Sequence, residues 1–96
     1  MTKMKYEIHA EKSFRKQSKL LKKRGYNMEL LYDIVLKLAN GETLSPKNRD
    51  HPLQGDRRGY RDCHIKDDWI LIYKIDKSIL TLILSETGKH SDLLEY

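Results

Sequence analysis

The feature that most constrains the fold is a pair of apolar runs near the end of the chain. Residues Trp69 to Ile75 read Trp-Ile-Leu-Ile-Tyr-Lys-Ile, and residues Ile79 to Leu84 read Ile-Leu-Thr-Leu-Ile-Leu. The short polar segment Asp76-Lys77-Ser78 joins them, which is typical of a β-hairpin. Because few polar residues interrupt either run, we expect both strands to lie centrally in a sheet, covered on both faces.

Two further strands are predicted around this hairpin. Residues Tyr60 to Ile65 form one of them. Residues Met4 to His9 alternate apolar and polar and predict a half-buried strand, with Met4, Tyr6 and Ile8 on its inner side. Thr87-Gly88 is expected to break the last strand, and Ser91 to cap a brief helical turn.

The segment between these strands predicts a helical hairpin. Ser13 is a candidate cap for a first helix that runs to Arg24 and stops at Gly25. Asn27 caps a second helix, which has apolar residues at helical spacing and ends at Asn40-Gly41. Residues 41 to 59 are expected to be a long loop, a feature that is often functional in so small a domain.

The predicted order is therefore β-α-α-β-β-β, which indicates an α+β fold. An N-terminal strand and a helical hairpin would pack on a mostly antiparallel sheet. The 96 residues are enough for a single domain, 1–96, and not comfortably two.

Composition narrows the class of protein. The chain has 19 Lys and Arg against 14 Asp and Glu, a net charge of +5, which favours a polyanionic partner such as nucleic acid or an acidic protein. It has one cysteine, Cys63, and its N-terminal segment lacks the apolar core of a signal peptide. No stretch is long enough to span a bilayer, so we expect a cytoplasmic protein.

Three of the four histidines fall in the second half of the chain: His51 in the long loop, His64 near a strand end, and His90 after the last strand. Strand alternation puts Asp62 and His64 on the face opposite Cys63 and Ile65. His9, beside the first helix, is interpreted as structural.

This residue set suits RNA cleavage without a metal. Such cleavage needs a base for the 2′-hydroxyl, an acid for the 5′-oxygen and positive charge at the phosphate. Histidine can take either proton-transfer role near neutral pH. Arg57, Arg58 and Arg61 would supply the charge, Asp67 and Asp68 could orient an imidazole or act as a base, and Trp69 could stack on a base.

Each of these residues also has an ordinary structural interpretation. A lone strand histidine is more often a surface residue than a catalyst, Trp69 is more often core, and Asp67-Asp68 can simply form a turn. A zinc site is not favoured, because adjacent Cys63 and His64 point to opposite faces and no CxxC or HxxxH pair exists. Cys63 likewise lacks the motif of a nucleophile.

Four ordered motifs give the chain a family resemblance. They are Asp50-His51-Pro52-Leu53-Gln54-Gly55, then Gly59-Tyr60-Arg61-Asp62-Cys63-His64, then Asp68-Trp69-Ile70-Leu71-Ile72-Tyr73, then Thr87-Gly88-Lys89-His90-Ser91-Asp92-Leu93. In order and spacing they resemble the YafQ-type mRNA interferase toxins of the RelE/ParE toxin–antitoxin superfamily, over essentially the whole chain.

The resemblance implies a ribosome-dependent endoribonuclease that cleaves mRNA in the ribosomal A site and inhibits translation. It also implies a RelE-like fold similar to microbial ribonucleases, and catalysis without metal or cofactor. The family's active-site positions correspond to His51, His64, Asp68 and His90. We assign His90 as the acid, and leave base and phosphate-stabilising roles shared among the other three.

The chain departs from the family pattern at two positions. Leu94 stands where the family usually has a phenylalanine that helps to position RNA, and Asp67 stands where proline is common. The second departure leaves open whether Asp67 or Asp68 is the catalytic aspartate.

The resemblance also implies partners: a cognate antitoxin, mRNA on the ribosome, and operator DNA through the antitoxin complex. Two alternatives remain open. One is a ParE-like toxin that inhibits DNA gyrase without nuclease activity. The other is a basic nucleic-acid-binding module in which the histidines have no role.

Overall fold

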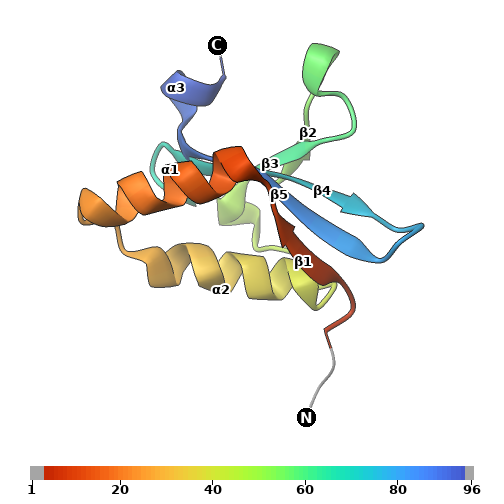
Figure 1. Ribbon diagram of the computed structural model, residues 1–96. Coiled ribbons are helices and arrows are strands. Elements are labelled where there is room, and N and C mark those ends of the chain that lie inside the picture. Colours follow the sequence, from red (N-terminus) through yellow and green to blue (C-terminus); the bar gives the residue numbers. More distant parts are fainter. Residues whose placement is uncertain (1–3, 95–96) are drawn as a thin grey trace.

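A single five-stranded sheet organises the computed structural model, which describes residues 4–94 (Figure 1). The strand order is β1-β5-β4-β3-β2, where β1 pairs parallel with β5 and the other neighbours are antiparallel. The predicted α+β class and mostly antiparallel sheet are thus confirmed. The strands are β1 (Glu7–Ala10), β2 (His51–Pro52), β3 (Arg61–Lys66), β4 (Trp69–Asp76) and β5 (Thr81–Lys89).

Two long helices cover one face of this sheet, and a third, short helix follows β5. Their bounds are α1 (Lys12–Lys23), α2 (Met28–Ala39) and α3 (His90–Leu93). Buried side chains of α1 and α2 share one cluster with side chains of β3, β4 and β5. Within residues 4–94, the helices are all too short or too polar to cross a bilayer.

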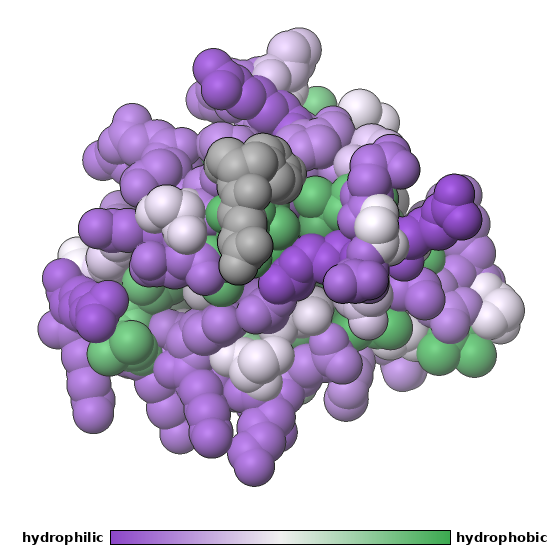
Figure 2. Space-filling model, turned by 90° about the horizontal axis from the view of Figure 1, so that it is seen from above, coloured by the Kyte–Doolittle hydropathy of each residue, from purple (hydrophilic) through white to green (hydrophobic). Residues whose placement is uncertain are grey.

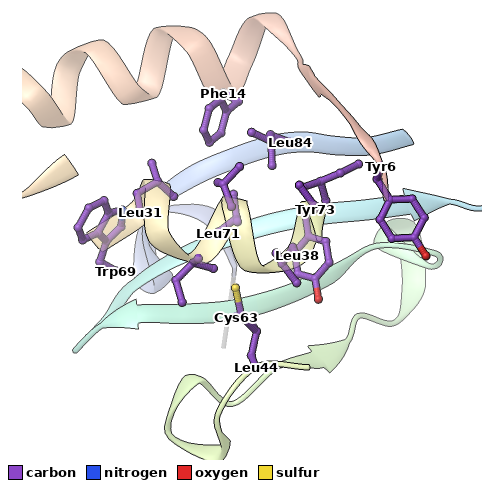
Figure 3. Close-up of a cluster of buried hydrophobic side chains, with 14 of the residues drawn as sticks. Tyr6, Phe14, Leu31, Leu38, Leu44, Cys63, Trp69, Leu71, Tyr73 and Leu84 are labelled. Carbon is purple, nitrogen blue, oxygen red and sulfur yellow. The ribbon is translucent and has the colours of Figure 1, made fainter. Parts of the chain in front are cut away.

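The central strand β4 is covered on both faces, as its apolar run predicts. Trp69, Leu71 and Tyr73 point into the cluster beneath α1 and α2, where Cys63 also lies (Figure 3). Ile70 and Ile72 point the other way, into a smaller cluster with Leu53 and Leu94. The opposite face of the sheet is therefore only partly apolar, and the rest of it is available for polar side chains.

The helix ends confirm the predicted stops but not both predicted caps. The Asn27 side chain accepts a hydrogen bond from the Glu29 N–H, and Gly25 ends α1 in a left-handed conformation (φ 86°). The prediction of Ser13 as a cap is wrong. Glu11 is the N-cap residue, and the Ser13 hydroxyl donates to the Ser85 carbonyl at 2.6 Å.

The predicted N-terminal strand is too long, and its inner side is wrong in part. Tyr6 is buried, but Met4 and Ile8 are 44% and 39% exposed. The reason is that Tyr6 lies before β1 and donates its N–H to the Ala39 carbonyl at the end of α2. Ile8 lies on an edge strand that pairs only with β5.

The last strand also differs from the prediction. It begins at Thr81, because Ile79 and Leu80 belong to an exposed turn in which Leu80 has φ 49°. Thr87-Gly88 does not break it, since pairing with β4 continues through Ile70↔Gly88 to Trp69↔Lys89. His90 consequently follows directly on a strand that is held in the sheet to its end.

The segment 41–59 is not a structureless loop. It contains two 3-10 helices, η1 (Pro46–Asn48) and η2 (Gly55–Arg57), and between them the short strand β2. Strand β2 pairs with β3 so that His51 lies opposite Asp62. This pairing fixes a loop histidine to the sheet.

Candidate active site

The three histidines of the second half of the chain converge on the sheet face opposite α1 and α2. His51 comes from β2, His64 from β3, and His90 from the first residue of α3. His64 points away from the core that holds Cys63, as strand alternation predicts. All three side chains are partly exposed, so solvent or a substrate can reach them.

His51 is oriented by a backbone hydrogen bond. Its Nδ1 lies 2.7 Å from the Arg49 carbonyl oxygen, and Arg49 adopts a left-handed conformation (φ 47°) that directs this oxygen back to the ring. Because a carbonyl can only accept, we infer that Nδ1 carries a proton. The Nε2 atom of His51 is then the one left for proton transfer.

His64 is held in the same way. Its Nδ1 lies 2.9 Å from the Asp67 carbonyl, in a turn where Asp67 has φ 50°. The Asn48 side chain donates to the His64 carbonyl at 2.8 Å, which ties η1 to this strand. Because Nδ1 of His64 lies against the Asp67 carbonyl, its Nε2 is the nitrogen left for proton transfer. The centroid of the His64 ring is 6.0 Å from the centroid of the His90 ring.

His90 is fixed through its backbone. Its N–H donates to the Asp68 carbonyl at 2.7 Å, and its own carbonyl accepts from the Leu94 N–H at 2.8 Å. Asp67 and Asp68 thus both orient a histidine by a carbonyl oxygen. The Asp68 residue is exposed in the turn between β3 and β4, where its carboxylate is accessible to a substrate.

A buried carboxylate lies next to these histidines. Asp62 is fully buried, and its Oδ1 is 3.3 Å from His51 Nδ1. Burial raises the pKa of Asp62, and the nearby His51, His64 and His90 act against that rise. Sequence reasoning placed Asp62 on the face of His64 but not in the site. The signal that could have found it is its cross-strand pairing with His51, which required recognising β2.

The three predicted RNA-binding arginines lie in different environments. Arg57 pairs with Glu86 and donates to the Leu93 carbonyl at 3.1 Å, so it holds α3 against the sheet. Arg61 pairs with Asp50 at 3.2 Å, and it alternates with Asp62 so that its side chain leaves the histidine face. Arg58 is exposed in the loop after η2.

Trp69 and Leu94 are both buried. Trp69 is 3% exposed, and its indole N–H donates to the Thr87 hydroxyl at 2.9 Å, which argues against the predicted stacking on an RNA base. Leu94 is 5% exposed and packs with Leu53, Ile70 and Ile72, where it anchors the end of α3.

A basic depression adjoins His64, and sequence reasoning did not identify it. It has a volume of about 370 Å³ and is lined by Lys47, Arg49, Lys66 and Asp67 in addition to His64. These cations come from η1 and from the end of β3, so only the folded chain brings them together.

Seen from the end that carries α3, the molecule is mostly hydrophilic, with hydrophobic atoms showing between the polar ones (Figure 2).

The thiol of Cys63 lies apart from the histidines and carboxylates of this site. Within residues 4–94, no group of three or more His, Cys, Asp or Glu side chains is arranged to hold a metal ion. Cys63 lies in the core on the far face of the sheet, and burial raises the pKa of its thiol. The side chains that lie together at this site are the histidines and the neighbouring carboxylates.

Comparison with known proteins identifies close relatives. The family described as "Bacterial toxin of type II toxin-antitoxin system, YafQ" matches residues 6–95. The mRNA interferase toxin YafQ of Escherichia coli K12 is 40% identical over 88 residues, which cover 91% of this chain and 94% of that protein.

Solved structures agree with this likeness. A crystal structure of a metal-bound toxin from Helicobacter pylori is 43% identical with a TM-score of 0.87, covering 93% of this chain and 99% of that one. The E. coli DinJ–YafQ toxin–antitoxin complex contains a chain that is 37% identical with a TM-score of 0.85, covering 95% of this chain and 99% of that one.

Proposed function

Since the chain belongs to the YafQ family of bacterial type II toxins, we propose that it is an endoribonuclease that cleaves mRNA in the ribosomal A site and thereby inhibits translation. The observation that carries this proposal is the convergence of His51, His64 and His90 on one sheet face. These residues come from three separate motifs, and a general acid and a general base must lie on the two sides of one phosphate.

The proposed reaction is an in-line transfer at phosphorus without a metal. The 2′-hydroxyl loses its proton to a base, and the 2′-oxygen forms a bond to the phosphorus of the adjacent phosphate. The bond from phosphorus to the 5′-oxygen breaks as an acid donates a proton to that oxygen. The products are a 2′,3′-cyclic phosphate and a 5′-hydroxyl, and no oxidant or cofactor is consumed.

We assign the acid to His90 and the base to His64. Their ring centroids are 6.0 Å apart, which would allow the two rings to lie on the two sides of one phosphate. His51, which lies beside Asp62, would stabilise the charge that develops on the phosphate. The exposed Asp68 carboxylate is a further candidate for the base.

The RNA backbone is proposed to enter through the depression beside His64. Lys47, Arg49 and Lys66 line it, and each can neutralise a phosphate. Arg58 would add charge from the loop after η2, while Arg57 would act indirectly by holding α3. Leu94, in the place where the family usually has an aromatic residue, would support the site by packing against Ile70 and Ile72 of β4.

Partners follow from the family. We propose a cognate antitoxin, as in the E. coli DinJ–YafQ complex, with an acidic segment that covers the basic surface and keeps the toxin inactive. Operator DNA would be bound through the antitoxin in that complex. Because the proposed substrate is mRNA on the ribosome, the proposal places the protein in the cytoplasm.

Expression of the free toxin in a bacterial host tests the proposal. Wild type should arrest growth and cut translated mRNAs within the coding region, whereas His90→Ala should do neither. His9→Ala serves as the control, since His9 is exposed on β1, away from the site. Equal toxicity of His90→Ala, or arrest with DNA damage and intact mRNA, would reject the nuclease and favour a gyrase inhibitor.

A further inference from the structure

The second half of β5 has a strand neighbour on only one side. Pairing of β1 with β5 ends at Ala10↔Leu84, while pairing of β4 with β5 continues to the end of β5. Within residues 4–94, the sheet therefore has an open edge along residues 85–89, which immediately precede His90. An open edge leaves backbone N–H and C=O groups without partners in a neighbouring strand.

The same segment contains a β-bulge. The pairing of β4 with β5 shifts at Ser85, which is an extra residue without a counterpart in β4. A bulge bends a strand and changes the direction of the side chains that follow it. After this bulge Thr87 is buried, whereas Glu86 pairs with Arg57. The bulge therefore sets the course of β5 as it leads to His90.

Two side chains of α1 occupy the open edge. Helix α1 follows β1 in the chain and packs against β5 (Figure 1). The Ser13 hydroxyl donates to the Ser85 carbonyl at 2.6 Å, and the Gln17 amide oxygen accepts from the Thr87 N–H at 2.9 Å. Ser13 and Gln17 are on one face of the helix, since residues at i and i+4 are neighbours there. They give β5 hydrogen-bond partners where β1 no longer reaches.

Gln17 is also connected to α3 through side chains. Its Nε2 lies 3.5 Å from Glu86 Oε1, which is a long contact. The other carboxylate oxygen of Glu86 pairs with Arg57, and Arg57 donates to the Leu93 carbonyl at 3.1 Å. A cavity of about 110 Å³ separates α1 from α3 at this point, and Gln17 and Leu93 both line it. Polar contacts rather than close packing therefore relate α3 to α1 here.

We propose that Gln17 is a positioning residue for His90. By holding the Thr87 N–H, its amide oxygen fixes the bulged end of β5, and His90 follows directly on that strand. This inference rests on the proposed function, in which His90 is the acid, and adds to it a residue from α1. Gln17 does not touch the reacting atoms and acts through β5. A displaced catalytic group loses rate steeply, since a shift of about 1 Å can cost about 10²-fold.

The test compares three variants of the purified toxin with wild type. Gln17→Met keeps the length of the side chain but removes the acceptor. Gln17→Glu keeps an acceptor for the Thr87 N–H, and Arg57 offsets the charge that it adds near Glu86. Ser18→Ala is the matched control, because Ser18 is the next residue of α1 and its buried hydroxyl has no hydrogen-bond partner within residues 4–94.

Two quantities are measured on each protein. One is the pair kcat and KM for cleavage of mRNA on ribosomes, expressed per folded molecule, and the other is deuterium exchange of the Thr87 amide by NMR. In wild type this amide should exchange as slowly as the β5 amides that bond to β4. For Gln17→Met we expect exchange about tenfold faster or more, and kcat about 10- to 100-fold lower at an unchanged KM. Gln17→Glu should stay within a few-fold of wild type, and Ser18→Ala should match it.

Three results would overturn the inference. Rapid exchange of the Thr87 amide in wild type would show that Gln17 does not hold it, whether or not the variants fold. A wild-type kcat in Gln17→Met would separate the contact from catalysis. Equal losses of kcat in Gln17→Met and Gln17→Glu would show that the acceptor is not the cause. If wild type itself cleaves no mRNA, the proposed function fails, whereas the exchange data still report whether Gln17 fixes the end of β5.

Discussion

The imidazole rings of His64 and His90 lie with their centroids 6.0 Å apart and their planes inclined by 32°. The Asp67 carbonyl lies within hydrogen-bond distance of the His64 ring, and the Asp68 carbonyl accepts from the backbone N–H of His90, so a single turn contacts both residues of the pair. The tight connection between β3 and β4 is thus part of the site, because it fixes the relative position of the proposed base and acid.

Substitutions in the basic depression should weaken RNA binding without altering the chemical step. For Lys47→Gln and Lys66→Gln we expect a higher KM or weaker binding, a nearly unchanged kcat, and a salt dependence of log K reduced by about one phosphate contact for each lysine. Binding to a short RNA across a salt series measures this. Lys37→Gln on α2 is the control, and an equal effect there would argue against a local RNA site.

Arg57 and Arg58 are adjacent in sequence but should act differently. Arg57→Gln removes the contacts to Glu86 and to the Leu93 carbonyl, so α3 and His90 should be less well placed. We expect kcat to fall and α3 amides to exchange faster with deuterium. Arg58→Gln should leave exchange in α3 unchanged and affect only binding. The same exchange pattern in both variants would contradict the role given to Arg57.

Trp69 should contribute to stability rather than to RNA stacking. Trp69→Phe removes the hydrogen bond to Thr87 and part of the buried ring, so the free energy of unfolding should fall by about 1–3 kcal/mol. Cleavage per folded molecule should stay within a few-fold of wild type. Urea denaturation and a rate normalised to folded protein measure both quantities, and a large loss of binding at unchanged stability would restore the stacking interpretation.

The contact between Tyr73 and Asp50 should stabilise the segment that carries His51. The Tyr73 hydroxyl donates to Asp50 Oδ1 at 2.7 Å, and Arg61 pairs with the same oxygen at 3.2 Å. Tyr73→Phe should reduce the free energy of unfolding by about 1 kcal/mol, since the lost hydrogen bond is largely buried. Tyr32→Phe, at an exposed tyrosine of α2, should have no measurable effect, and equal losses in both would show that the contact is not the cause.

Much of the fold could be predicted from strong local patterns. The apolar run of β4 has to be buried on both faces, and the Asn27 cap and the Gly25 stop need only the local backbone. Local structure was predicted less well where a residue type is compatible with two structures. Ser13 has the chemistry of a cap, but its hydroxyl is used by the Ser85 carbonyl. Gly88 resembles a strand breaker, yet Ile70 pairs with it in the sheet.

The histidines of the candidate site could be named from the sequence, but their relative positions in space could not. His51 belongs to the cluster because two residues of a loop pair with β3, which no periodicity reveals. Asp62 was visible on the face of His64, but only the packing around it shows that it is buried and lacks a hydrogen-bond partner within residues 4–94. The cations of the depression come from two separate elements, so their proximity is a property of the folded chain.

The rate at which purified protein cuts mRNA on a ribosome with an empty A site tests the central claim most directly. We predict that His64→Gln and His90→Gln, which keep a polar side chain of similar length, each reduce the single-turnover rate by about 10²- to 10⁴-fold while binding of the ribosome is retained. His9→Gln should cleave as wild type does. Wild-type rates in both His64→Gln and His90→Gln would contradict the account.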